Sequence, residues 1–245
     1  MDPMSEEAKM ITEYSNNQNG VKARDFKSNS QTQIRLRAEF HQHYRGLYSY
    51  EIKRGEARGT GEPISNEEAG LYLMAFDHRE PWGTFRKYEV FEDKPNALFA
   101  RPEVSADRIV LLRVIDEEIR KHLPNLKADL LARYSLTKFM IMYVIQELFF
   151  DDIAFKEILS SASTYMRDLK QREKFRQVIS GFIANIVIDI NVESEDFEAD
   201  FDYRRKLKDA DWVKNLAKNI KRDFQKDILR NRQETFEAEW NKINI

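Results

Sequence analysis

The 245-residue chain contains no cysteine, only eight glycines and only six prolines. Without cysteine it can form no disulfide framework, no thiolate metal site and no thiol nucleophile, and this composition is typical of an intracellular protein. The small number of turn-forming residues and the scarcity of alternating apolar and polar stretches argue against a sheet-rich fold. The sequence therefore predicts a mainly α fold, an irregular multi-helix bundle with a short N-terminal strand or hairpin element.

Neither charge sign is in excess, because 40 Lys and Arg residues face 42 Asp and Glu residues and the formal net charge is −2. This balance does not require a nucleic-acid or membrane partner, although it can hide strong local charge. The longest apolar run, 136–150, holds eleven apolar residues in fifteen. It is shorter than the roughly 18 residues that a membrane-spanning helix needs, so we expect a buried helix and no membrane partner.

Several motifs of common enzymes are missing. The sequence contains no Gly-x-x-x-x-Gly-Lys-Ser/Thr phosphate loop, no Gly-x-Gly-x-x-Gly turn and no Gly-x-Ser-x-Gly elbow. His41 and His43 lie two residues apart on a predicted helix, where their side chains diverge by about 200° and cannot bind one metal ion together. We therefore expect no resident metal and no cofactor.

Apolar residues make up 42% of the chain and aromatic residues 12%, which is enough for a sizeable core. Two capping boxes, Ser30–Gln33 and Ser65–Glu68, predict helix starts. Apolar residues at helical spacing predict helices over 31–46, 65–76, 105–123, 126–149, 155–169, 175–190 and 213–228. The β-branched run 186–188 is compatible with a strand, but it continues the helical stripe and favours a helix.

Two stretches between these helices have a different pattern. Alternating aromatic and polar residues predict a short strand over 48–53, and the glycines and the proline of 55–63 predict a mobile loop after it. Residues 78–102 are expected to be irregular, because prolines interrupt them while several aromatic residues, Trp82 and Phe85 among them, anchor them to the core.

An amide-dense turn, Asn-Asn-Gln-Asn-Gly at 16–20, precedes the first predicted helix and is followed by Lys22 and Arg24. Amide side chains both donate and accept hydrogen bonds, and beside cations they can bind a polar ligand, a phosphate backbone or another protein segment. A local explanation is also available, in which the Asn side chains cap a preceding helix and Gly20 adopts a left-handed conformation. Both interpretations stay open.

Three further stretches accompany this turn: Tyr-Ser-Tyr-Glu-Ile-Lys-Arg-Gly-Glu at 48–56, Tyr-Arg-Arg-Lys-Leu-Lys at 203–208 and Asp-Trp-Val at 211–213. Together with the amide turn they resemble the abortive-infection phage-resistance (AIPR) family, over most of residues 10–230. The resemblance implies a bacterial, cytoplasmic protein of antiphage defence, whose relatives commonly sit beside restriction–modification genes.

In that family a long region with a Gly-x-Gln-Thr motif normally precedes the amide turn, and nothing in this sequence matches it. Two methionines around Asp2 and Pro3 resemble an added leader. We therefore expect the chain to be the C-terminal portion of a longer protein. The expected organisation is a leader or disordered segment at 1–9, the end of an upstream domain at 10–62 and a helical domain at 63–245.

This organisation predicts a pocket that the amide turn shares with the upstream part of the protein. The candidates for ligand binding are amides and arginines near that boundary: Asn17, Gln18, Asn19, Arg24 and Arg54.

Charge is distributed unevenly in the last third of the chain. Residues 189–202 contain seven acidic and no basic side chains, whereas 204–232 contain eleven basic and four acidic ones. The two blocks can pair with each other, the basic helix can face a polyanion, or its charges can form an ordinary solvated face. The candidate nucleic-acid contacts on this helix are Lys214, Lys218, Lys221 and Arg222. Residues 22–58 are also basic, which favours DNA if both elements share a face.

Glu51 and Lys53 have the spacing of the second half of a metal-dependent nuclease motif. In such sites two acids bind Mg²⁺ and the lysine holds a water or a phosphate. The further acid must lie nearby at the start of a strand, but Glu39 is predicted to be helical and Asp25 to precede that helix. A surface strand with alternating charges is the favoured explanation of the pair.

The leading hypothesis is a binding or scaffold module of an antiphage defence protein, whose partner is DNA or another defence-system protein. A DNA nuclease that uses Glu51, Lys53 and Mg²⁺ is one alternative. A purely structural oligomerisation domain is another. The sequence assigns no oligomeric state.

Overall fold

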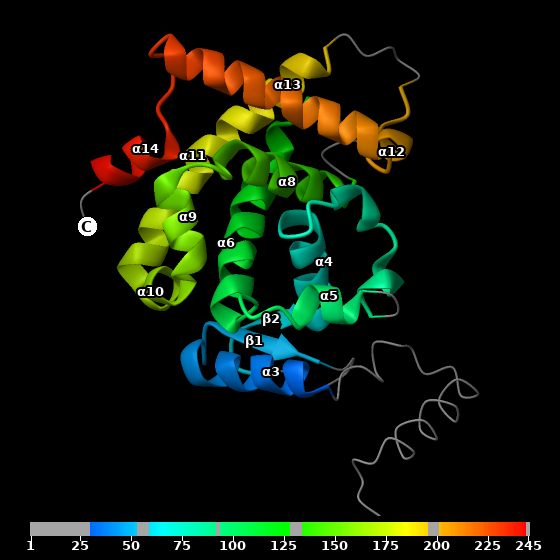
Figure 1. Ribbon diagram of the computed structural model, residues 1–245, viewed down its shortest axis with the longest axis vertical. Coiled ribbons are helices and arrows are strands. Elements are labelled where there is room, and N and C mark those ends of the chain that lie inside the picture. Colours follow the sequence, from blue (N-terminus) through cyan, green and yellow to red (C-terminus); the bar gives the residue numbers. More distant parts are fainter. Residues whose placement is uncertain (1–29, 53–58, 92–93, 128–133, 196–200, 244–245) are drawn as a thin grey trace, which may run out of the picture. The chain divides into compact units, whose positions relative to one another are not determined.

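The computed structural model describes residues 30–52, 59–91, 94–127, 134–195 and 201–243 (Figure 1). Internal contacts divide the chain into two compact units. Unit 1 comprises residues 1–70 and 87–102, and unit 2 comprises residues 71–86 and 103–245. Most of the described residues are helical, which confirms the predicted mainly α fold.

Unit 1 is built around a helix and a two-stranded sheet. Its elements are α3 (Gln31–His43), β1 (Tyr48–Glu51), β2 (Glu62–Ser65), the first residues of α4 (Asn66–Phe76), η2 (Lys87–Val90) and α5 (Pro95–Phe99). The serine caps of both predicted helix starts are confirmed, because the Ser30 hydroxyl accepts a hydrogen bond from the backbone N–H of Gln33 and the Ser65 hydroxyl accepts one from that of Glu68. The Gln33 amide, predicted to reach back to Ser30, instead accepts a hydrogen bond from the Tyr50 hydroxyl. The inner face of α3 packs on β1 and buries Leu36.

The two strands run parallel, with Tyr48 opposite Glu62. The predicted loop over 55–63 is therefore wrong at its end, where β2 begins, and the parallel pairing excludes the hairpin alternative. Gly61, just before β2, has φ +107°, and a Cβ atom there would lie 2.6 Å from the carbonyl carbon of Leu47. A glycine permits both the left-handed conformation and this close backbone approach.

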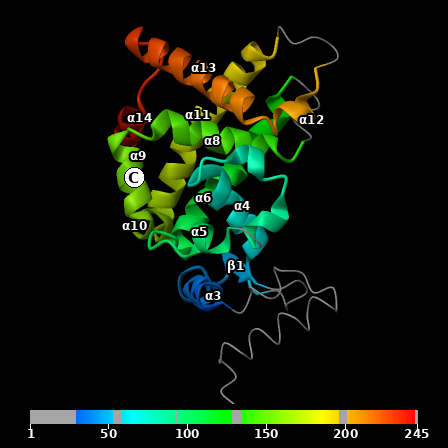
Figure 2. The same ribbon diagram turned by 45° about the vertical axis from the view of Figure 1, so that its right-hand side comes forward.

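Unit 2 contains the remaining helices. They are residues 71–76 of α4, η1 (Pro81–Gly83), α6 (Ala106–His122), η3 (Leu123–Asn125), α8 (Thr137–Phe149), α9 (Ile153–Ser160), α10 (Ala162–Arg167), α11 (Leu169–Glu193), α12 (Tyr203–Lys206), α13 (Ala210–Leu229) and α14 (Phe236–Lys242). The helix α6 packs against α8, α10 and α11. In both ribbon views α13 lies across α8, with which it is in contact (Figures 1 and 2).

Three expectations about the helices need correction. The helix predicted over 126–149 begins only at Thr137, because 134–136 are not helical. The helix predicted over 155–169 is two helices that meet at Ser161, and the Asp168 side chain caps α11 instead of continuing α10. The stretch 78–102 includes three short helices, two of which begin at a proline, a residue that fits the first helical turn.

Among the described residues, α11 alone is long and apolar enough to cross a membrane by length and composition, with a mean hydropathy of 1.3 over 18 residues. Half of that window is buried in the structure. Core helices pass the same test, and α6, α13 and α14 pack against α11. The helix is therefore weak evidence for a membrane span.

The core of unit 2 is centred on the ring of Phe149, at the end of α8. Ring centroids of four other phenylalanines lie 4.8–5.8 Å from it, each on a different helix. They are Phe155 on α9, Phe182 on α11, Phe224 on α13 and Phe236 on α14. One side chain thus joins five helices through aromatic contacts, each of which adds about 0.5–1.5 kcal/mol to area burial.

Phe149→Ala should lower the free energy of unfolding by about 3–5 kcal/mol, because truncation of a buried aromatic ring leaves a cavity among rigid neighbours. The adjacent Phe150→Ala is the matched control, since Phe150 is 45% exposed. Its cost should stay below about 1 kcal/mol. Urea denaturation of both variants measures the difference, and equal losses would contradict a core centred on Phe149.

Buried charge also connects the helices of unit 2. The carboxylate of Asp116, fully buried on α6, accepts hydrogen bonds from the Tyr72 hydroxyl at 2.8 Å and from Arg120 Nε at 2.7 Å. Lys138 Nζ of α8 lies 3.0 Å from the same carboxylate. Because a buried carboxylate is stable only with such partners, the group specifies how α4, α6 and α8 meet.

A second carboxylate, Asp189 on α11, lies near other carboxylates. Burial, followed by the negative charges of Asp227, Asp223 and Glu193, raises its pKa to about 6 from an ordinary value of 3.8. Arg222 and Lys226, which lie on the same stretch of α13, both bind Asp223. Folding therefore favours the protonated form of Asp189.

This raised pKa predicts that stability falls as pH rises. The contribution of Asp189 is complete below its ordinary pKa and is lost as pH rises through about 6. At about pH 8 the free energy of unfolding of Asp189→Asn should exceed that of the unsubstituted chain by roughly 1–3 kcal/mol. This gap between the two free energies should close near about pH 4. Urea denaturation across this pH range measures the gap. The control is Asp151→Asn, whose side chain is 78% exposed, and a gap independent of pH would contradict the assignment.

Candidate functional site

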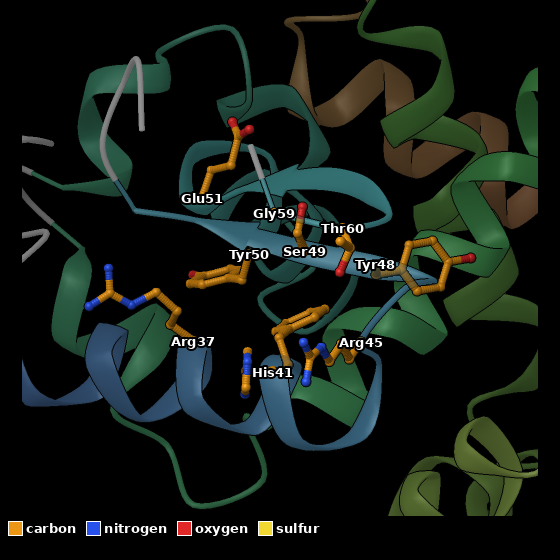
Figure 3. A pocket seen from close by; sticks show the side chains of 10 residues that line it. Arg37, His41, Arg45, Tyr48, Ser49, Tyr50, Glu51, Gly59 and Thr60 are labelled. Carbon is orange, nitrogen blue, oxygen red and sulfur yellow. The ribbon is translucent and has the colours of Figure 1, made fainter. Parts of the chain in front are cut away.

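Unit 1 contains a pocket of about 360 Å³ between α3 and β1 (Figure 3). The helix, the strand and the residues just before β2 all contribute to it. Its lining consists of Arg37, Phe40, His41 and Arg45, then Tyr48, Ser49, Tyr50 and Glu51, and finally Gly59 and Thr60. Every one of these residues belongs to unit 1.

One wall of the pocket is cationic. Arg37 and His41 are four residues apart on α3, and Arg45 follows four residues later just beyond its end, so the three side chains share one side of the pocket (Figure 3). All three are exposed. Within the part of the chain that the structure describes, neither the His41 nor the Arg45 side chain takes part in a hydrogen bond or an ion pair.

The floor of the pocket is aromatic and well fixed. Phe40, Tyr48 and Tyr50 are buried, and the rings of Phe40 and Tyr50 stack with their centroids 5.1 Å apart. The Tyr50 hydroxyl donates a hydrogen bond to Gln33 Oε1 at 2.7 Å, and both groups are buried. The strand is thereby held on the inner face of α3, which leaves the cationic side of the helix at the pocket.

Ser49 supplies a polar group that no described residue satisfies. Its Oγ is buried and has no hydrogen-bond partner among the described residues. Gly59 packs directly on this side chain, because a Cβ atom at position 59 would lie 2.8 Å from Ser49 Cβ. Glu51, at the end of β1, carries the single carboxylate of the described lining.

Most of the predicted ligand-binding residues cannot be placed. Asn17, Gln18, Asn19, Arg24 and Arg54 lie outside the described residues, as does Lys53. The shared pocket of the amide turn and the pairing of Glu51 with Lys53 therefore stay predictions.

Two of the three acidic residues considered for the nuclease hypothesis lie among the described residues. Glu51 ends β1, and Glu39 lies on α3, where its carboxylate binds Arg35 NH1 at 2.6 Å. Asp25 lies outside the described residues. Over those that are described, no three His, Asp or Glu side chains converge as metal ligands would.

The predicted nucleic-acid contacts lie on α13 in unit 2. Lys214, Lys218 and Arg222 recur every four residues on its exposed side, with Lys221 partly exposed beside them. The opposite side buries Val213, Leu216, Ala217, Ile220 and Phe224. The helix is amphipathic, as its sequence predicts, and its outer side is basic.

Two aromatic side chains far away in the sequence extend this basic side. Lys214 Nζ lies 4.8 Å from the ring centroid of Trp82, and Lys208 Nζ lies 4.7 Å from that of Phe85. Arg86 also lies over Phe85, at 5.3 Å, and Phe85 remains 43% exposed. The sequence predicts both rings as core anchors, and no local pattern signals their contact with lysines more than 120 residues away.

Acidic groups limit the basic area at both ends. The Arg222 guanidinium donates to Asp223 at 3.2 Å, and Asp211 is exposed at the start of α13. In the acidic block, Glu193 accepts a hydrogen bond from Asn219, Glu195 accepts one from Lys127, and Asp202 caps α12. The cationic surface is therefore defined by Arg86, Lys208, Lys214, Lys218 and Lys221, together with Trp82 and Phe85, and we call it the basic face.

Residues 2–81 match the family model described as AIPR protein. Over this segment, which is shorter than 10–230, the match confirms the resemblance noted in the sequence. Every residue that lines the unit 1 pocket falls within it. No curated protein and no solved structure matches the chain.

The pocket floor yields a stability prediction. Tyr50→Phe removes the donor to Gln33 Oε1 and leaves a buried acceptor unpaired, which should cost about 1–3 kcal/mol of unfolding free energy. The double variant Tyr50→Phe/Gln33→Leu removes both partners and should cost less than the sum of the two single substitutions. Chemical denaturation of the three variants completes this double-mutant cycle. Strictly additive costs would show that the bond does not couple α3 to β1.

Proposed function

We propose that this chain belongs to the AIPR family and acts in antiphage defence by binding nucleic acid through the basic face of unit 2. The antiphage role follows from the family match over residues 2–81. The nucleic-acid role is carried by one observation, the line of lysines on α13 that continues over the rings of Trp82 and Phe85. In this role the protein works in the bacterial cytoplasm, with DNA as its partner.

The spacing of the lysines suits a linear polyanion. Residues four apart on a helix are separated by about 6 Å along its axis, so Lys214 and Lys218 present charge at regular intervals. Phosphates neutralised in this way release counterions, which makes binding strong at low salt and independent of base sequence. An acidic protein surface has no need of such regular spacing.

The aromatic rings favour a prearranged surface. A lysine side chain ordinarily loses rotamer freedom when it binds, whereas an ammonium group held over an aromatic ring has lost part of it already. Lys208 and Lys214 are held in this manner, over Phe85 and Trp82. In this interpretation the rings hold the lysines that contact phosphates. No base-specific contact is proposed.

A gel-shift titration of the full chain with supercoiled plasmid, across a salt series and with and without Mg²⁺, tests the proposal. We expect a salt-sensitive shift that weakens in the triple variant Lys214→Gln/Lys218→Gln/Lys221→Gln. Loss of three phosphate contacts should reduce the slope of log K against log salt by roughly 2–3. Absence of a shift at low salt would overturn the proposal.

A matched control separates the basic face from general charge. The triple variant Lys156→Gln/Lys170→Gln/Lys242→Gln removes the same charge from exposed positions on α9, α11 and α14 of the same unit. It should retain the shift, and an equal loss in both variants would exclude a specific role for α13.

The same titration tests the alternatives. A Mg²⁺-dependent nick that Glu51→Gln abolishes would favour the nuclease hypothesis. Lack of any shift, together with a defined oligomer in light scattering, would favour a scaffold that binds a second copy of this chain or another defence protein.

A further inference from the structure

We propose that the pocket of unit 1 binds a small phosphate ester of nucleotide size, with its phosphate at Arg45 and His41. This site lies in a different unit from the basic face, and it does not depend on the proposed nucleic-acid binding. It is argued from α3, β1 and the residues just before β2, whereas the predicted site of the amide turn lies outside the described residues.

The capacity of the pocket suits such a ligand. Its volume of about 360 Å³ is close to the lower end of the roughly 300–1,000 Å³ found for small-molecule sites. A buried aromatic floor with a few polar groups around it is also typical of those sites. The pocket therefore has room for a mononucleotide and not for a long polymer.

The charge of the wall selects an anion. Arg45 and His41 present cationic or donor groups that no described residue engages, and Arg37 adds a third group on the same side. A guanidinium group binds phosphate through two parallel N–H bonds, which makes arginine well suited to a phosphate ester. Glu51 alone opposes this charge within the described lining.

The position of Glu51 indicates what the other end of the ligand carries. Arg45 lies next to the start of β1 and Glu51 at its end, so the two groups lie near opposite ends of a strand about 10 Å long (Figure 3). A carboxylate accepts hydrogen bonds and repels a second phosphate. The ligand therefore has one anionic end and a hydrogen-bond-donating end, as in a nucleoside monophosphate with its sugar hydroxyl or base amino groups.

Ser49 gives an independent reason to expect a ligand. A buried hydroxyl without a hydrogen-bond partner is uncommon in folded proteins, because its desolvation is not compensated. Among the described residues Ser49 Oγ is such a group, and Ser49 lines this pocket. A hydroxyl or ring nitrogen of the bound nucleotide would satisfy it.

Isothermal titration calorimetry of the full chain with AMP, adenosine and inorganic phosphate tests the proposal. AMP should bind at least about tenfold more tightly than either fragment, because each fragment makes only part of the contacts. Equal affinity for AMP and inorganic phosphate would overturn the proposal in favour of a simple anion site. Lack of AMP binding at millimolar concentration would also overturn it.

A pair of arginine variants on the same segment locates the site. Arg45→Gln should weaken AMP binding by about tenfold or more, through loss of a charge-assisted contact. Arg35→Gln is the matched control, because Arg35 lies on α3, is exposed, binds Glu39 and does not line the pocket. Equal losses in both variants would overturn the assignment. Both positions are exposed, so circular dichroism should show unchanged folding.

Ser49→Ala provides a second variant. It should weaken AMP several-fold without altering the affinity for inorganic phosphate, and unchanged AMP affinity would remove Ser49 from the site. The Lys214, Lys218 and Lys221 triple variant should bind AMP normally. If that variant lost AMP binding while Arg45→Gln retained it, the pocket assignment would fail, whereas the nucleic-acid proposal would not.

Discussion

The aromatic contact of Phe149 with four helices is the constraint on which the arrangement of unit 2 depends. One of those helices is α13, whose inner side enters the core through Phe224, 5.8 Å from Phe149 between ring centroids. An amphipathic helix that is anchored by one side presents its other side to solvent. The exposure of Lys214 and Lys218 is therefore a consequence of core packing, and the basic face rests on a rigid support.

In unit 1 a smaller aromatic core likewise fixes one side of a helix. The stack of Phe40 on Tyr50 and the buried bond from Tyr50 to Gln33 hold α3 against β1. With its inner side occupied in this way, α3 places Arg37 and His41 along the pocket. In both units, buried aromatic groups determine where the cations lie, and the cations determine which ligands are attractive.

Much of the helical structure could be predicted from the sequence, because caps and apolar periodicity are local signals. Ser30, Ser65 and the long stripe of α11 identified their helices, and the β-branched residues 186–188 are helical as that stripe predicts. The errors fall where tertiary contacts outweigh local preference. Strand β2 has few residues of high strand propensity, and it exists because its backbone pairs with β1.

The sequence by itself determined the mainly α class, the helix starts, the amphipathic character of α13 and the AIPR resemblance, because each depends on residues close together in the chain. Only the tertiary structure decided which distant groups meet. Trp82 contacts Lys214, and Ser49 Oγ is buried beside Gly59 with no partner among the described residues, through packing that no local pattern encodes. Both candidate sites are formed by groups that the tertiary structure brings together. Binding needs side chains that are close in space, whereas the sequence directly specifies only those that are close along the chain.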